Sequence, residues 1–152
     1  MSGCTRRRVL LACASTTVPV GCLGSNDPPL GLRKIEITNG ADEEVNVHLL
    51  VRKSGTLVYD EVITLGTELG EKYAEVTKDW MGDREYYEMT AETTVGGQQL
   101  SASSNSDSLV GDNRDFSETS CFELSVSVFD DEIGMAHGFH DSCELPAAEA
   151  HD

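Results

Sequence analysis

Acidic residues are missing from the first 26 positions of this chain of 152 residues, and no apolar run in it is long enough to span a membrane. The longest, residues 9–20, holds about a dozen apolar or small residues, whereas a spanning helix needs about 20. No Gly-x-Ser-x-Gly motif occurs, which removes the nucleophile elbow of serine hydrolases. No Asn-x-Ser/Thr sequon occurs either, so N-linked sugar is not expected.

Basic residues are scarce, with 11 Lys and Arg against 27 Asp and Glu. Only eight of the basic residues but all of the acidic ones follow Cys22, so residues 22–152 carry a net charge of −19. Such a surface repels phosphate backbones and anionic lipid heads, and we therefore expect no nucleic-acid partner. The acids are scattered along every segment, which indicates a solvated halophilic surface whose self-repulsion is screened in molar salt, where the Debye length is about 3 Å.

The first 22 residues have the order of an export signal. Arg6, Arg7 and Arg8 precede the apolar stretch, and small Gly21 then comes before Cys22. Positive charge, apolar core and small residues in that order are typical of a signal peptide that is removed from the mature protein. Residues 1–21 are therefore predicted to be a signal peptide.

Residues 5–10, Thr-Arg-Arg-Arg-Val-Leu, and residues 19–22, Pro-Val-Gly-Cys, resemble the leader of haloarchaeal twin-arginine lipoproteins. That leader reads Ser/Thr-Arg-Arg, an apolar stretch and a lipobox ending in Cys, with Leu where Pro19 stands here. The paired Arg6 and Arg7 correspond to the part read by the export receptor. The resemblance implies cleavage before Cys22, lipid on its sulfur and attachment to the extracellular face of the cell membrane. An uncleaved anchor and free secretion are the alternatives.

The remaining cysteines predict one cross-link. Two of the five lie in the leader and Cys22 is the lipid candidate, which leaves Cys121 and Cys143. In an exported protein such a pair indicates a disulfide. If residues 130–134 form the loop of a hairpin, antiparallel register places Cys121 opposite Cys143.

Residues 22–31, with two prolines and two glycines, are predicted to be a tether, residues 32–143 a single domain and residues 144–152 a disordered tail. Apolar residues alternate with polar ones in most of the domain, and turn residues separate the segments. The predicted strands are 32–38, 45–52, 56–65, 72–77, 86–95, 98–103, 122–128 and 135–140. Seven or eight short strands without a convincing helix predict an all-β fold, an antiparallel immunoglobulin-like β-sandwich.

A second resemblance covers most of this domain. A Trp-containing loop before a strand opened by Tyr, with two late cysteines closing the domain, is similar to β-sandwich domains common in haloarchaeal lipoproteins. The residues that carry it are Trp80, Tyr86, Tyr87, Cys121 and Cys143. Residues 104–120 have no useful periodicity and are predicted to be a loop, either mobile or binding.

Two groups of residues are candidates for a site. Trp80 and Met81 could contact a partner, because both residue types are enriched at interface cores, or Trp80 could cap the end of the core. His137 and His140 are candidate metal ligands, since imidazole beside the thioether of Met135 and the thiol of Cys143 is a copper ligand set. Strand alternation separates the two imidazoles, however, and the disulfide would take Cys143. We therefore expect no metal and no cofactor.

The sequence predicts a membrane-anchored protein of the cell surface that is not an enzyme. Binding or structural work is the expected task, with an envelope protein or an extracellular ligand as partner. A small metal or redox carrier and a protease-inhibitor-like module are the alternatives. The hypothesis rests on the predicted cellular location and the fold class, and no catalytic motif contributes to it.

Overall fold

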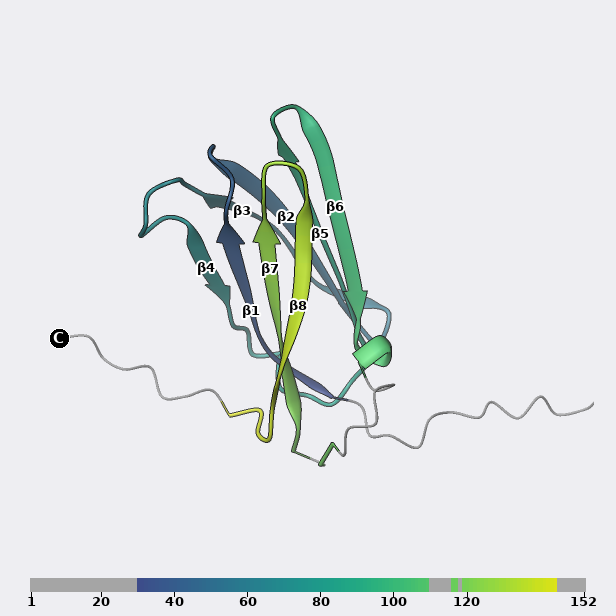
Figure 1. The fold of residues 1–152 in the computed structure, drawn as a ribbon. Helices are drawn as coiled ribbons and strands as arrows, with labels where there is room; N and C mark the ends of the chain where they lie inside the picture. Colours follow the sequence, from purple (N-terminus) through teal and green to yellow (C-terminus); the bar gives the residue numbers. More distant parts are fainter. Residues whose placement is uncertain (1–29, 110–115, 118, 145–152) are drawn as a thin grey trace, which may run out of the picture.

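A computed structural model describes residues 30–109, 116–117 and 119–144. The predicted leader and most of the predicted tether and tail lie outside the described residues, as do Arg6, Arg7 and Cys22. Eight strands and one short 3-10 helix, η1, form the domain (Figure 1). Their bounds are β1 Gly31–Asn39, β2 Val45–Lys53, β3 Thr56–Leu65, β4 Tyr73–Val76, β5 Tyr87–Val95, β6 Gln98–Asn105, η1 Ser106–Leu109, β7 Cys121–Val128 and β8 Ile133–His140.

The strands form two four-stranded sheets that face each other, with the orders β4-β1-β7-β8 and β3-β2-β5-β6. This confirms the predicted all-β sandwich of seven or eight strands, and the structure has eight. One pair departs from the predicted antiparallel arrangement, because β1 and β7 run parallel from Gly31–Cys121 to Asn39–Val128. Parallel neighbours need a long crossover, and here most of the domain separates the two strands. Local alternation carries no information about such a pairing.

The core lies between the two sheets, and period-two alternation places it correctly in the central strands. Along β5, Tyr87, Met89, Ala91, Thr93 and Val95 are all buried. β2 and β7 show the same pattern of buried residues at every second position. Full burial of a large apolar side chain stabilises the fold by about 1.5–3 kcal/mol. These central rows are therefore what holds the sheets together.

β3 departs from a strict alternation. A single face over residues 56–65 would bury Leu57 together with Tyr59 and Leu65, but Leu57 is exposed and the other two are buried. The register with β2 shifts between the pairs Val51–Tyr59 and Arg52–Leu57. A bulge adds one residue to one strand, which reverses the face of every residue beyond it.

The β7–β8 hairpin has a different register from the predicted one. Cys121 lies opposite His140 and Val128 lies opposite Ile133, so Cys143 follows the strand end instead of facing Cys121 within the ladder. The reason is a turn that begins earlier than predicted, in which the amide of Phe129 donates to the carbonyl of Glu132 at 2.8 Å. The chain after His140 then brings Cys143 back to Cys121.

The packed domain begins before the predicted boundary at residue 32. Leu30 is fully buried and Gly31 is the first residue of β1. The alternation of apolar and polar residues that indicates the first strand starts only after Gly31. Glycine has no side chain to contribute to that pattern, so the sequence assigns Gly31 to the tether. Leu30 and Gly31 therefore belong to the packed domain, two residues before the predicted boundary.

The predicted loop over residues 104–120 has structured ends. β6 continues to Asn105 and leads into η1. Phe116 stacks on Phe139 of β8, with ring centroids 5.3 Å apart, and packs against the core. Residues 110–115 and 118 lie outside the described part of the chain. Phe116 thus fixes the chain on its return towards β7.

Candidate functional site

Four chain connections gather at one end of the sandwich, which we call the distal end (Figure 1). They are residues 40–44, residues 66–72, the 96–97 turn and residues 129–132. β1 and β7 both start at the opposite, proximal end and run towards this one. Loops held by a rigid sheet scaffold are where β-sandwich proteins carry binding residues. The distal end is therefore the candidate interaction site.

Asn39, the last residue of β1, organises two of these connections from a buried position. Its side-chain amide contacts the carbonyl oxygens of Glu43 at 2.8 Å, Gly66 at 2.9 Å and Leu65 at 3.3 Å. Its side-chain oxygen accepts from the amide of Ala41 at 2.9 Å. A buried polar side chain with all of its groups bonded fixes the backbone around it. Asn39 thereby holds the chain after β1 against the chain after β3.

The other two connections are bonded to the same structure. The amide of Asp42 donates to a carboxylate oxygen of Asp130 at 3.2 Å. The amide of Gly96 in the β5–β6 turn donates to the carboxylate of Glu43. All four connections are therefore linked to one another by hydrogen bonds, which makes the distal end one connected surface.

This surface combines strong acidity with two exposed apolar side chains. Leu69 is 97% exposed and Phe129 is 43% exposed. The acids in the distal connections are Asp42, Glu43, Glu44, Glu68, Glu71, Asp130, Asp131 and Glu132. Leu69 and Phe129 lie in two different connections, each next to acidic residues.

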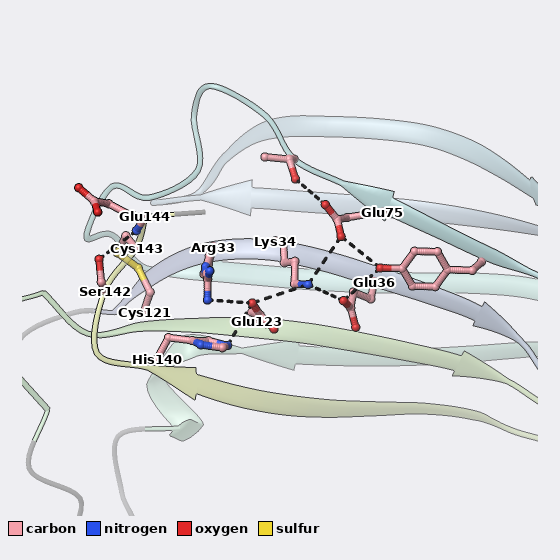
Figure 2. Close-up of polar contacts among 12 residues, drawn as sticks. Arg33, Lys34, Glu36, Glu75, Cys121, Glu123, His140, Ser142, Cys143 and Glu144 are labelled. Carbon is pink, nitrogen blue, oxygen red and sulfur yellow. Dashed lines mark hydrogen bonds and ion pairs between the residues drawn. A yellow bond between two sulfur atoms is a disulfide. The ribbon is translucent and has the colours of Figure 1, made fainter. Parts of the chain in front are cut away.

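The proximal end is closed by the disulfide between Cys121 and Cys143, whose Cα atoms are 5.1 Å apart (Figure 2). The first strand passes directly against it. A Cβ atom on Gly31 would lie 2.6 Å from the Cys121 sulfur, 2.8 Å from the Cys143 sulfur and 2.7 Å from the carbonyl oxygen of Gly82. Only glycine fits there, which explains why a glycine opens β1.

An ion-pair cluster covers the outer face of the β4-β1-β7-β8 sheet (Figure 2). Lys34 contacts the carboxylates of Glu36 at 2.5 Å, Glu75 at 3.6 Å and Glu123 at 3.8 Å. The hydrogen bond to Glu36 is the main cause that raises the pKa of Lys34, and the same bond lowers the pKa of Glu36. Cross-strand pairs of opposite charge stabilise a sheet, and this cluster does so between β1, β4 and β7.

Glu123 has two further nitrogen-bearing neighbours on this face. Arg33 lies 3.3 Å from its carboxylate, and the Nε2 atom of His140 lies 3.0 Å from it (Figure 2). The Glu123 side chain is only 16% exposed, so its charge is poorly solvated and needs these partners. His140 is thus part of a structural cluster on the outer face.

His137 lies on the opposite face of β8 from His140. Its Nε2 atom bonds to the hydroxyl of Ser104 at 2.8 Å, and its ring is 6.1 Å from the ring of Phe122 in the core. Burial lowers its pKa, which favours the neutral imidazole. The structure therefore separates the two histidines that the sequence offered as metal ligands. No group of three or more His, Cys, Asp or Glu that could hold a metal occurs among the described residues.

Trp80 closes the proximal end of the core with Met81 beside it. Its ring centroid is 6.4 Å from that of Tyr59 and 6.4 Å from that of Tyr87, and it is half-buried against the core. Lys53 donates to its backbone carbonyl at 3.3 Å. Of the two interpretations that the sequence left open, the cap on the core is the one that these contacts support. Trp80 and Met81 also lie at the end away from the distal connections.

Sequence reasoning missed two bonded groups. His48 lies 2.6 Å from Asp60 and 4.0 Å from Glu92 on the outer face of the β3-β2-β5-β6 sheet. Asn39 stands in an Asn-Gly pair, which by itself indicates only that a strand stops there. An outward position for His48 could be inferred from alternation, but its neighbours depend on a register that the sequence does not contain.

The fold and the distal end define the class of the protein, an all-β sandwich domain with a connected, acidic loop surface. Comparisons with models of protein families, with curated proteins and with solved structures found no match. Within the described residues, no helix is both long and apolar enough for a membrane span. The function is therefore argued from the chain's own residues.

Proposed function

We propose that this protein is a lipid-anchored module of the cell surface, without catalytic activity, that binds its partner through the distal end. The observation that carries the proposal is the direction of β1. Its first residue, Gly31, lies at the proximal end and its last, Asn39, at the distal end. An anchor at Cys22 would hold the proximal end near the membrane and leave the distal end free.

The length of the intervening chain supports this arrangement. Eight residues lead from Cys22 to Leu30, and a fully extended chain of that length reaches about 30 Å at most. The sandwich would therefore stay close to the membrane, and its strongly acidic surface would be repelled by anionic lipid heads. Binding to another envelope protein or to an extracellular ligand then falls to the distal end.

The chemistry of the distal end favours a protein partner with basic and apolar groups. Its acids attract positive charge and raise the rate of encounter, while Leu69 and Phe129 offer area that can be buried on contact. The hydrogen bonds from Asn39 fix these connections before binding, which lowers the entropy lost on association. The same charge disfavours nucleic acid.

The alternative of a metal or redox carrier has less support. It needs both imidazoles on one ion, and His137 and His140 lie on opposite faces of β8 with Ser104 and Glu123 as their respective partners. Cys143 is bonded to Cys121. We therefore favour the binding module.

Anchoring is tested by the intact mass and the detergent phase partitioning of the protein from its own membranes. The expected wild-type protein begins at Cys22, carries added lipid mass and enters the detergent phase. A Cys22→Ser variant should be released or left unprocessed, whereas Cys13→Ser, inside the leader, should behave as wild type. An unmodified wild-type chain would refute the anchor.

Binding through the distal end is tested by placing a photoreactive group on single cysteines in intact cells. Leu69→Cys puts the group at the distal end and Asp79→Cys puts it in the exposed β4–β5 connection at the proximal end. We expect a defined cross-linked product from position 69 and none from position 79. Equal products from both positions, or none from position 69, would contradict the proposed surface.

A further inference from the structure

The outer faces of the two sheets use their polar side chains differently. On the β4-β1-β7-β8 sheet, Arg33 and Lys34 both contact Glu123 in the ion-pair cluster (Figure 2). On the β3-β2-β5-β6 sheet, several outward polar side chains form no hydrogen bond or ion pair with another described residue. They are Arg52, Thr90, Thr94, Gln99, Ser101 and Ser103. Their donors and acceptors are available to a molecule that docks on this face.

Two hollows follow one another along this face. The first has a volume of about 450 Å³, and its lining includes Leu50, Arg52, Glu88, Thr90, Ser103 and Asn105. The second has a volume of about 420 Å³, and its lining includes Asn46, His48, Val62, Glu92, Thr94 and Gln99. Both volumes fall within the range of about 300–1,000 Å³ that is typical of small-molecule sites. Each hollow is therefore large enough to hold one segment of an extended ligand.

The two hollows contain the same kinds of side chain from β5. This strand supplies Glu88 and Thr90 to the first hollow. It supplies Glu92 and Thr94 to the second, four residues further along the strand. At about 3.4 Å per residue, the two sets are about 14 Å apart. The strand thus presents one Glu-x-Thr pattern twice, in the same orientation.

The neighbouring strands continue this repetition. β2 places Arg52 opposite Glu88 and His48 opposite Glu92, so each carboxylate has a nitrogen-bearing side chain beside it on the adjacent strand. Each hollow also has an aliphatic side chain and an amide of β6, namely Leu50 and Asn105 in the first, Val62 and Gln99 in the second. A ligand that fills both hollows must therefore repeat its own chemistry along its length.

We propose that the outer face of the β3-β2-β5-β6 sheet binds a neutral oligosaccharide chain, which runs along β5 and fills both hollows. Sugar hydroxyl groups both donate and accept hydrogen bonds. The carboxylates of Glu88 and Glu92 accept from them, and the guanidinium of Arg52 donates to them. Leu50 and Val62 cover the apolar C–H faces of the sugar rings. This site lies along the strands, apart from the distal connections, and does not depend on the proposed lipid anchor.

The charge of the face selects a neutral chain. Arg52 is the only Lys or Arg among the residues that line the two hollows, which also include Glu44, Glu88 and Glu92. These carboxylates, together with the net charge of −19 on residues 22–152, repel an anionic chain. A cationic chain would find carboxylates on every part of the surface and would not prefer the hollows. Only a neutral chain uses the donors and the acceptors of both hollows together.

The test is a calorimetric titration of the purified full chain with neutral oligosaccharides. The probes are cellohexaose, mannohexaose and N-acetylated chitohexaose, each compared with its own disaccharide. We expect saturable binding of at least one hexasaccharide. Its affinity should be at least about tenfold higher than that of its disaccharide, because only the longer chain reaches both hollows. Since the ligand is uncharged, this affinity should stay constant over the range of KCl concentration in which the protein is folded.

Two variants locate the site. Arg52→Gln should weaken the binding about tenfold, because it removes the charged donor of the first hollow. Lys72→Gln is the matched control, since it removes the same charge from the connection between β3 and β4 and should bind as wild type. Both should keep the β-sheet circular dichroism. Failure of every hexasaccharide to bind would overturn the proposal. So would equal affinities of the hexasaccharide and its disaccharide, equal losses in the two variants, or an affinity that falls as salt rises.

Discussion

The buried side-chain amide of Asn39 donates to the carbonyl oxygen of Gly66 at 2.9 Å, across 27 positions of sequence and between the two sheets. Asn39 ends β1 in one sheet, and Gly66 follows β3 in the other. The bond therefore ties the sheets together at the distal end, whereas the Cys121–Cys143 disulfide lies at the proximal end. Both the shape of the proposed binding surface and part of the stability of the sandwich depend on it.

Replacing Asn39 by Ala should lower the free energy of unfolding by about 2–3 kcal/mol, because the buried carbonyl of Leu65 and the partly buried carbonyl of Gly66 lose this donor. Urea denaturation followed by circular dichroism measures the loss. Asn46→Ala removes an exposed amide that accepts from Thr64, and it should cost less than about 0.5 kcal/mol. Similar losses in the two variants would mean that the buried hydrogen bonds of Asn39 contribute no more to the free energy of unfolding than an exposed one.

Gly31→Ala should destabilise the fold by about 1–3 kcal/mol, since the new methyl group would press on both sulfurs of the disulfide and on the carbonyl of Gly82. Gly70→Ala is the control, because nothing lies within 4 Å of a Cβ atom there and its φ is not positive. Thermal unfolding of both variants checks the difference. A Gly31→Ala protein as stable as Gly70→Ala would show that β1 can move away from the disulfide.

Glu36 should contribute to the acid sensitivity of the fold. The hydrogen bond from Lys34 lowers its pKa from the ordinary value of 4.5, so the unfolded state binds this proton more readily. Its contribution to stability is present above about pH 4.5 and is lost as the pH falls through the lower folded pKa. Unfolding of Glu36→Gln between pH 3 and 7 should show a shallower pH dependence than wild type.

The matched control for that experiment is Glu68→Gln, at an exposed position of the distal connection between β3 and β4. It should retain the wild-type slope below pH 4.5. If Glu36→Gln also retains it, the bond between Lys34 and Glu36 does not contribute to stability in solution.

Stability should rise with salt, because residues 22–152 carry a net charge of −19 and their mutual repulsion is screened at high ionic strength. The midpoint of thermal unfolding, measured from about 0.1 M to several molar KCl, checks this expectation. Individual ion pairs such as Lys34–Glu123 weaken under the same conditions, so a falling midpoint would show that they outweigh the general repulsion.

Much of the architecture could be predicted from alternation alone. The inward row of β5 from Tyr87 to Val95 is buried as expected, and the Gly96-Gly97 turn has the positive φ values that a tight hairpin needs. Alternation is a local property and can be read from one segment at a time. Strand count and fold class follow from it.

Pairing and register could not be predicted in this way. The parallel contact of β1 with β7 joins the two ends of the domain, and the β7–β8 register depends on one backbone hydrogen bond between Phe129 and Glu132. The role of Asn39 has the same origin, since its acceptors come from distant segments. Such features are determined by which segments meet, and single-sequence patterns do not record that.

The position of β1 also determines how the domain responds to mechanical force. β1 lies between β4 and β7, and a pull on the residues before Gly31 against a hold at the distal end acts along the strand axis. The hydrogen bonds on both sides of β1 run across that direction. For β1 to slide past its neighbours, these bonds must break together instead of one by one. A pulled domain of this design resists in shear, and the strand that carries the load is the one that leads from the chain's N-terminal side into the core.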